Sequence, residues 1–361
     1  MSIATRRRPS ESGWRAGRPR LEATFGEVSA RAKIVLLVGL AAVLAVGAVV
    51  AGALLLGDDT PAATEAAATT GTEPAEPGEE RPPALELAVI DRDDEDATAL
   101  RRGEFLYEEG DPDGARESFQ AVLERDPDSI EAAIGAAYAS WPDGTLEELE
   151  ALALRHPTSA VLRLNLGLVR LALGDLEAAQ DEWREAEEGE PDAPAALKAE
   201  DLLNPQSPPG RPQFFLTGFP NEAAGLTIGK RIDALTRRAR AGDARDWLFL
   251  GSTLEQAGRR ISAQRAYDRA LELEPSSLDA RVAAIVARFD KDDPSAAFSQ
   301  LGPLASRNRD EPVVSFHLGL MLLWLPDLDR AREQLTAART AAPRSFYGRQ
   351  ADRILTELAN A

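Results

Sequence analysis

Residues 247–275 read WLFLGSTLEQAGRRISAQRAYDRALELEP, and the spacing of their small and large residues decides the fold. Trp247 and Leu250 lie three residues apart, which places both on one face of a helix. Gly258 is a residue that adopts positive φ at low cost and ends this helix. Pro275 ends a second helix because proline cannot continue one. The stretch therefore predicts two helices packed as an antiparallel pair.

The same pattern of small residues, one large residue and a proline recurs along the chain. One helix pair cannot bury its own apolar face, so such a pattern is expected to repeat. The matching sets are Gly103, Gly110, Ala115, Phe119 and Pro127; Gly167, Gly174, Ala179, Trp183 and Pro191; Gly251, Gly258, Ala263, Tyr267 and Pro275; and Gly319, Ala331, Leu335, Ala338 and Pro343. In this pattern the chain resembles the tetratricopeptide repeat (TPR) family, which implies an all-α solenoid of helical hairpins.

The repeats fall into two blocks of about three units each. The first block is predicted over 93–201 and the second over 226–361, with one degenerate unit in each. A last helix at 345–359 is expected to cover the open end of the second block, as a solenoid requires.

A long apolar stretch precedes the repeats. Residues 34–56 are 23 consecutive uncharged residues, which as a helix span about 35 Å, enough to cross the hydrocarbon core of a membrane. A secretory signal peptide is the rival interpretation, but its apolar region is shorter and its charged leader is brief. We therefore predict that the solenoid stands on an uncleaved N-terminal transmembrane helix.

The charges around this stretch predict its orientation. Residues 1–33 form a basic leader, predicted to be disordered, with eight Lys/Arg against three acids, whereas Asp58 and Asp59 follow the apolar stretch. Segments that flank a membrane helix on its cytoplasmic side carry an excess of Lys and Arg, so the N-terminus is expected in the cytoplasm and the repeats outside it. Few lysines against many arginines favour a GC-rich bacterial genome. The predicted location is a bacterial cell membrane, crossed once.

Composition limits the partners. The formal net charge of the chain is −19, and the leader contributes +5, so residues 34–361 carry −24. A solenoid with this net negative charge would repel nucleic acid. There is no cysteine, which excludes thiol catalysis and disulfides. Residues 57–92 are rich in Ala, Thr, Glu and Pro and are predicted to be a disordered stalk.

Catalytic and ligand motifs are not legible in the sequence. His156 and His317 stand alone, without the partners of a catalytic triad. The stretch 224–231 resembles a phosphate loop, but Arg231 stands where Ser or Thr binds magnesium. The acidic turn at 290–293 lacks the glycine and the glutamate of a calcium loop. We therefore expect no enzyme activity, no cofactor and no metal.

An insert at 202–225 separates the two blocks. Its five prolines exclude regular helix, yet Phe214, Phe215 and Phe219 are unlikely to be left in water. One hypothesis is that they pack on the leucines of the third unit, joining the blocks and filling part of a partner's groove. The alternative is that they cap the end of the first block.

The family resemblance implies a groove, because the first helix of each repeat lines a surface that holds an extended peptide or a partner helix. The matching positions are Leu100, Glu104 and Tyr107; Leu164, Leu168 and Leu171; Leu248, Ser252 and Glu255; and Phe316, Leu320 and Leu323. The Lys and Asn pattern with which some members grip a terminal carboxylate is absent from these positions. So apolar a groove favours a hydrophobic segment, from a partner or from this chain.

These observations predict a membrane-anchored scaffold or assembly factor of the bacterial cell envelope that binds a protein or peptide segment. Two alternatives stay open: a transmembrane regulator whose cytoplasmic leader binds a partner, and a regulatory subunit of an envelope enzyme. Small residues four apart in the apolar stretch, such as Gly47 and Ala51, are compatible with a homo-oligomer.

Overall fold

The computed structural model describes residues 82–325 and 327–360, and all regular structure in these ranges is helical. The helices are α2 (Glu95–Glu108), α3 (Pro112–Arg125), α4 (Ile130–Tyr138), α5 (Thr145–Arg155), α6 (Ala160–Ala172), α7 (Leu176–Gly189), α8 (Pro194–Leu203), the 3₁₀ turn η1 (Asn221–Ala223), α9 (Ile228–Ala241), α10 (Ala244–Gln256), α11 (Arg260–Leu273), α12 (Leu278–Val286), α13 (Ser295–Arg307), α14 (Pro312–Trp324), α15 (Leu328–Ala341) and α16 (Phe346–Asn360).

The predicted leader at 1–33 and the predicted membrane helix at 34–56 lie outside the described residues, as does most of the predicted stalk. Among the helices of the described ranges, none combines the length and the apolar character that a membrane crossing needs.

Consecutive helices form antiparallel hairpins, namely α2/α3, α4/α5 and α6/α7 in the first block and α10/α11, α12/α13 and α14/α15 in the second. Four of these hairpins, α2/α3, α6/α7, α10/α11 and α14/α15, cross at a glycine of their first helix. At Gly251 an added Cβ would collide with the Tyr267 ring, and at Gly103 with the Phe119 ring. The predicted all-α helical-hairpin solenoid is therefore confirmed for the described residues.

Local signals in the sequence explain where these helices begin and end. Asp94, Asp111, Asp175 and Asp327 cap the N-termini of α2, α3, α7 and α15, each accepting a hydrogen bond from a backbone amide in the first turn. Gly258 has φ of +74°, which lets the chain turn from α10 into α11.

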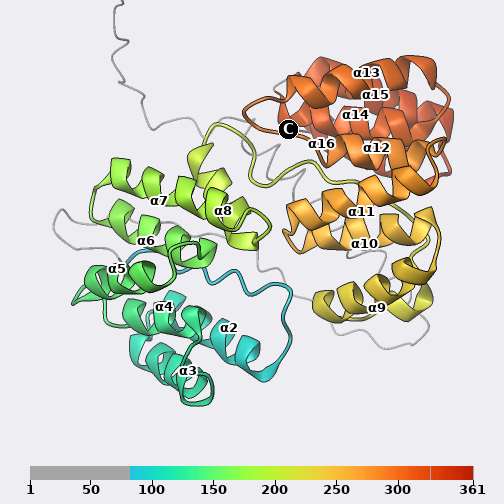
Figure 1. The fold of residues 1–361 in the computed structure, drawn as a ribbon. Helices are drawn as coiled ribbons and strands as arrows, with labels where there is room; N and C mark the ends of the chain where they lie inside the picture. Colours follow the sequence, from blue (N-terminus) through green and yellow to red (C-terminus); the bar gives the residue numbers. More distant parts are fainter. Residues whose placement is uncertain (1–81, 326, 361) are drawn as a thin grey trace, which may run out of the picture.

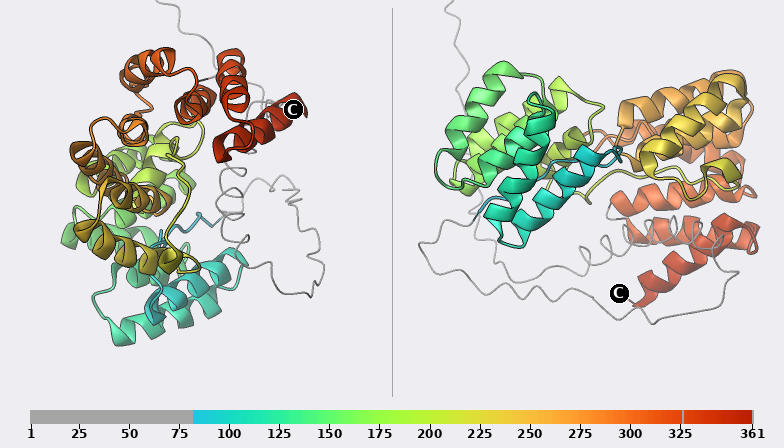
Figure 2. Two further views of the ribbon diagram at one scale, coloured as in Figure 1. Left: turned by 90° about the vertical axis from the view of Figure 1, so that its right-hand side faces the viewer. Right: turned by 90° about the horizontal axis from the view of Figure 1, so that it is seen from below.

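The two blocks lie side by side, with α2 to α8 in one and α9 to α16 in the other (Figure 1), and the view from below in Figure 2 shows the same separation. Each block has its own apolar core, because the large cluster of the second block contains no residue before Phe214. Helix α16 packs on α14 and α15 and covers the end of the second block.

Polar contacts join the blocks. Arg259 at the start of α11 lies 3.4 Å from Asp91 and 3.5 Å from Asp192, and the Ser262 amide donates to Asp192 at 2.8 Å. Lys291, which follows α12 and has a side chain only 1% exposed, pairs with Asp201 of α8. The relative placement of the blocks therefore depends on charge as well as on chain connectivity.

Candidate functional site

Residues 83–89, here called the N-terminal segment, lie extended against the first block and lead into α2 (blue in Figure 1). Pro83, Leu85, Leu87 and Val89 are buried, and the residues between them are not. This alternation is the period of an extended chain with one face on an apolar surface. The predicted disordered stalk over 57–92 is therefore wrong for residues 83–89, because Leu85, Leu87 and Val89 belong to the first core.

Side chains of α2 and α6 hold the backbone of the N-terminal segment. The Tyr107 hydroxyl donates to the Pro83 carbonyl at 3.0 Å, and Glu104 accepts from the Leu87 amide at 2.8 Å. Asn165 makes two bonds to one residue: its Oδ1 accepts from the Glu86 amide at 3.0 Å, and its Nδ2 donates to the Glu86 carbonyl at 2.7 Å. We call this binding surface groove 1.

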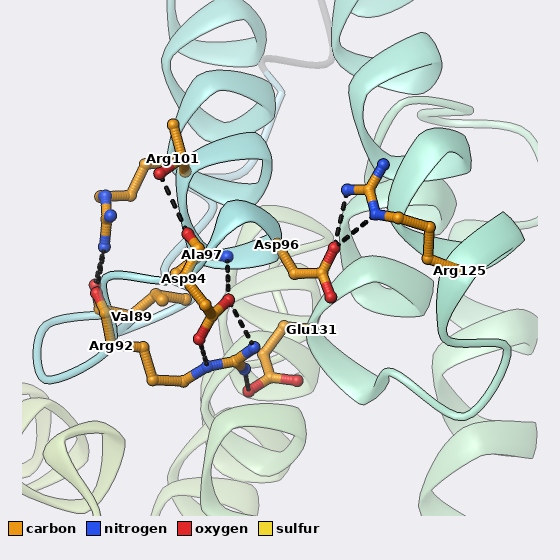
Figure 3. A network of polar contacts seen from close by, with 9 residues as sticks. Val89, Arg92, Asp94, Asp96, Ala97, Arg101, Arg125 and Glu131 are labelled. Carbon is orange, nitrogen blue, oxygen red and sulfur yellow. Dashed lines mark hydrogen bonds and ion pairs between the residues drawn. The ribbon is translucent and has the colours of Figure 1, made fainter.

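The exit of the N-terminal segment from groove 1 is fixed by a polar network (Figure 3). Arg101 donates to the Val89 carbonyl at 3.0 Å and to the Arg92 carbonyl at 2.9 Å. The Arg92 guanidinium lies between Asp94, at 3.1 Å, and Glu131 of α4, at 3.5 Å. These contacts connect the end of the segment to the start of α2.

Residues 212–217, here called the insert segment, lie extended against the second block. Pro212, Phe214 and Leu216 are buried, and Phe214 is only 1% exposed. The Phe214 ring stacks on the His317 ring with centroids 4.8 Å apart and meets Tyr267 edge-on at 5.7 Å. Burying a phenylalanine is worth about 1.5 to 3 kcal/mol, so these contacts are a large part of what holds the segment.

Side chains of α10, α14 and α16 hold the backbone of the insert segment. The Phe214 amide donates to Glu255 Oε2 at 2.9 Å, and the Phe215 amide donates to His317 Nε2 at 2.9 Å. The remaining bonds run from Ser252 to the Phe214 carbonyl at 3.3 Å, from the Tyr347 hydroxyl to the Phe215 carbonyl at 3.1 Å and from Arg245 to the Thr217 carbonyl at 2.6 Å. We call this binding surface groove 2.

Two titratable groups of groove 2 are held in their neutral forms. His317 Nε2 accepts the Phe215 amide, so Nδ1 carries the ring hydrogen and donates to the Val313 carbonyl at 2.7 Å. Burial lowers the pKa of His317 to about 4. Burial also raises the pKa of Glu255 to about 8, against the opposing effects of the Phe214 amide and the Tyr267 hydroxyl, which both donate to Oε2.

The insert phenylalanines pack on the second block, not on the leucines of the third unit. Helix α8 covers that unit, since Leu164 and Leu168 of α6 pack with Ala195 and Ala199 of α8. Both earlier hypotheses for the insert, docking on the third unit and capping the first block, are therefore wrong. The packing of Phe214, Phe215 and Phe219 on repeat helices is observed, with Phe219 lying 4.8 Å from the Phe249 ring centroid.

The twelve residues predicted to line a groove have three different surroundings. Glu104, Tyr107, Ser252 and Glu255 bond to the two extended segments, and Phe316 meets the Phe215 ring edge-on. Leu100, Leu164, Leu168, Leu248, Leu320 and Leu323 are buried among the helices, and Leu171 is 42% exposed. Their role toward a partner stays a prediction.

Sequence reasoning missed Asn165, Arg101, Arg245 and Tyr347, and it took His317 for a structural residue. A signal for two of them exists: Asn165 and His317 each stand two residues before the glycine at a hairpin crossing, Gly167 and Gly319. That position points along the same face of the first helix as the predicted groove residues.

A cavity of about 200 Å³ lies beside the insert segment. Its walls come from α8, α10, α11, α12 and α14 as well as from the insert, and they include Leu197, Gln213, Phe215, Val286 and Leu320. Among the described residues, no group of three or more His, Asp or Glu side chains is placed to hold a metal ion.

Two parts of the chain match models of the tetratricopeptide repeat family, residues 97–129 and residues 245–277. The CTR9 homolog of Arabidopsis thaliana is 30% identical over 118 residues, which are 31% of this chain and 11% of that protein. The chain therefore spans only a small part of the length of this curated relative.

Solved structures that the chain matches include a thermophilic TPR protein of Thermus thermophilus, with 22% identity, coverage of 53% of this chain and 98% of that one, and a TM-score of 0.26. The TPR2AB domain of yeast Sti1, solved in a complex with pHSP90, has 15% identity, coverage of 73% and 98%, and a TM-score of 0.27. Both similarities concern the helical-repeat architecture alone.

Proposed function

We propose that this chain, which is built of tetratricopeptide repeats, is a scaffold that binds an extended segment of a partner protein. The observation that carries the proposal is the chemistry of the two grooves. Each groove binds the backbone amides and carbonyls of an extended segment through side chains, and each takes every second side chain of that segment into its core. Both surfaces bind extended backbone of this chain, and this chemistry supports the binding of an extended partner segment.

Recognition of this kind suits a binding protein rather than an enzyme. Backbone hydrogen bonds supply affinity for any extended chain, and the pockets for alternate side chains supply specificity. His317 and Glu255 are both held neutral, and both are already bonded to the insert segment.

The proposal includes a location in the bacterial cell envelope. Residues 34–56 are long and apolar enough to cross a membrane once, and the basic leader before them favours a cytoplasmic N-terminus. The repeats would then bind their partner outside the cytoplasm. Protease added to intact spheroplasts should remove the repeats and leave a small membrane-bound fragment, and protection of the repeats would contradict this location.

The binding role is tested by site-specific crosslinking in membranes. A photoreactive amino acid at Leu320, which lines the cavity beside groove 2, should capture one segment of one partner, identified by mass spectrometry. The matched control is the same amino acid at Leu154, whose side chain is 86% exposed on α5. The proposal fails if Leu320 captures nothing, or if both positions capture the same set of proteins.

A further inference from the structure

The N-terminal segment and the insert segment share one sequence pattern. Residues 83–87 read PALEL and residues 212–216 read PQFFL, so both follow Pro-x-Φ-x-Φ, where Φ is a large apolar residue. In both, the proline and the two Φ residues are buried. The intervening residue, Glu86 in one and Phe215 in the other, offers its backbone amide to the groove.

Both segments also run in the same direction. In groove 1 the chain passes from Tyr107, near the end of α2, to Arg101, nearer its start. In groove 2 it passes from Glu255, near the end of α10, to Arg245, nearer its start. Each segment is therefore antiparallel to the first helix of the first hairpin in its block, α2 in one and α10 in the other.

The residues that bind the central amide are equivalent. Asn165 and His317 each stand two residues before a crossing glycine, on the third hairpin of their block. Each is anchored by a bond to the carbonyl four residues earlier, Asn165 to Val161 at 2.8 Å and His317 to Val313 at 2.7 Å. The two grooves are thus two copies of one arrangement of side chains that binds an extended segment.

Groove 2 is not completely filled by the insert segment. The cavity of about 200 Å³ is lined by Gln213, the residue between Pro212 and Phe214, and by apolar side chains that include Leu197, Val286 and Leu320. The charged residues at its edge are Arg211, Glu255 and Arg260. A bulky apolar side chain at the Gln213 position would fill this cavity and contact its apolar walls, whereas the polar glutamine does not fill it.

We propose, on the basis of the binding role proposed above, that groove 2 receives a Pro-x-Φ-x-Φ segment of the partner with a bulky apolar residue at the first x, and that the insert segment is its built-in competitor. The insert is tethered at both ends, by α8 and by α9. A short tether gives such a segment an effective concentration in the millimolar range, so only a partner with additional contacts displaces it. Filling the cavity with one large apolar side chain supplies about tenfold to a hundredfold in affinity.

The test uses the full chain in detergent micelles and labelled ten-residue peptides with the sequence of residues 211–220. One peptide keeps that sequence, a second carries Gln213→Trp, and a control carries Phe214→Ser with Leu216→Ser. Binding is measured by fluorescence anisotropy. Hydrogen exchange of the insert amides in the chain reports whether the insert segment leaves the groove.

The Gln213→Trp peptide should bind the natural chain at least tenfold more tightly than the unchanged peptide, and its binding should remove the protection of the Phe214 and Phe215 amides. The control peptide should not bind. A chain with Phe214→Ser and Leu216→Ser should bind both active peptides at least tenfold more tightly than the natural chain, and adding His317→Phe should reverse most of that gain.

The proposal is overturned if the insert amides stay protected while a peptide is bound, or if neither active peptide binds the natural chain. These two arms use the natural chain, so they decide the matter even where the double serine variant does not fold. A partner captured at Leu320 in membranes without loss of insert protection would leave the scaffold role intact and refute the displacement. If Leu320 captures no partner but the peptide displaces the insert segment, the scaffold role is refuted and the displacement of the insert segment stands.

Discussion

Asn165 and His317 occupy the same position in two different blocks and bind the same kind of group, the amide of the central residue of an extended segment. Their side chains differ in chemistry, since the Asn165 amide nitrogen has two hydrogens to donate, whereas the neutral His317 ring has one, which it donates to the Val313 carbonyl. Asn165 accordingly binds both the amide and the carbonyl of Glu86, whereas in groove 2 the carbonyl of Phe215 is bound by Tyr347. The task of one residue in groove 1 is divided between two in groove 2.

Replacing Asn165 with alanine should release the N-terminal segment. The variant loses both bonds to Glu86, which are partly buried, so the amide and carbonyl of Glu86 regain some contact with water and the two losses together should cost about 1 to 3 kcal/mol. We expect chemical denaturation to show a loss within this range, and the Glu86 amide to exchange faster with solvent. Asn360→Ala, at an exposed position of α16, is the control and should change neither measurement. Unchanged exchange at Glu86 would contradict this account.

His317 should make the fold sensitive to acid. Its pKa in the folded chain is about 4, and in the unfolded chain it is about 6.5, so only the unfolded chain gains this proton as the pH falls from 6.5. The stability that neutral His317 provides is therefore complete above pH 6.5 and is lost toward pH 4, by up to about 3 kcal/mol. His317→Gln keeps an acceptor for the Phe215 amide and cannot be protonated. Denaturation at pH 4.5 and pH 7 should therefore show a smaller difference for this variant than for the natural chain.

Glu255 should act in the opposite direction. Its pKa is about 8 in the folded chain and near 4.5 in the unfolded chain, so the folded chain keeps a proton that the unfolded chain loses. The stability associated with this group is complete below pH 4.5 and falls as the pH rises to 8, by on the order of a few kcal/mol. Glu255→Gln retains an oxygen acceptor for the Phe214 amide and does not ionise. The variant should be less sensitive than the natural chain to a change from pH 6 to pH 8, and an identical pH dependence would refute the assignment.

The repeats could be predicted from sequence because each hairpin leaves a local signature. Gly251 and Tyr267 lie sixteen residues apart on two helices joined by a short turn, so their contact follows from helix geometry and loop length. The alternation of buried residues in the N-terminal segment was also present in the sequence, in Leu85, Leu87 and Val89. The Ala, Thr, Glu and Pro composition before it outweighs this signal, because such a composition favours a disordered stalk.

The position of the insert could not be predicted in the same way. The insert bonds connect Phe215 to His317, 102 residues away, and to Tyr347, 132 residues away. No local period encodes contacts of such separation. The correct groove depends on α8 covering the third unit, which is a property of the assembled first block. The apolar character of the phenylalanines predicts that they pack on repeat helices. Which block they pack on depends on the tertiary structure.

The joint between the blocks provides the last prediction. Lys291 is almost completely buried and pairs with Asp201, which also accepts the Gly210 amide. Lys291→Met fills the same volume but leaves Asp201 without its cation, and removing one partner of a buried pair is costly, so we expect a loss of up to about 3 kcal/mol. Because the blocks have separate cores, their thermal transitions should also move apart in calorimetry.

Two further variants decide whether charge is the cause of that loss. Lys198→Met breaks the exposed pair with Glu86, 47% and 38% exposed and 3.4 Å apart, and should cost less than about 1 kcal/mol. Combining Lys291→Met with Asp201→Asn removes both charges and keeps an acceptor for the Gly210 amide, so it should recover at least half of the loss. If the double variant is as unstable as Lys291→Met alone, the uncompensated charge is not what destabilises the joint.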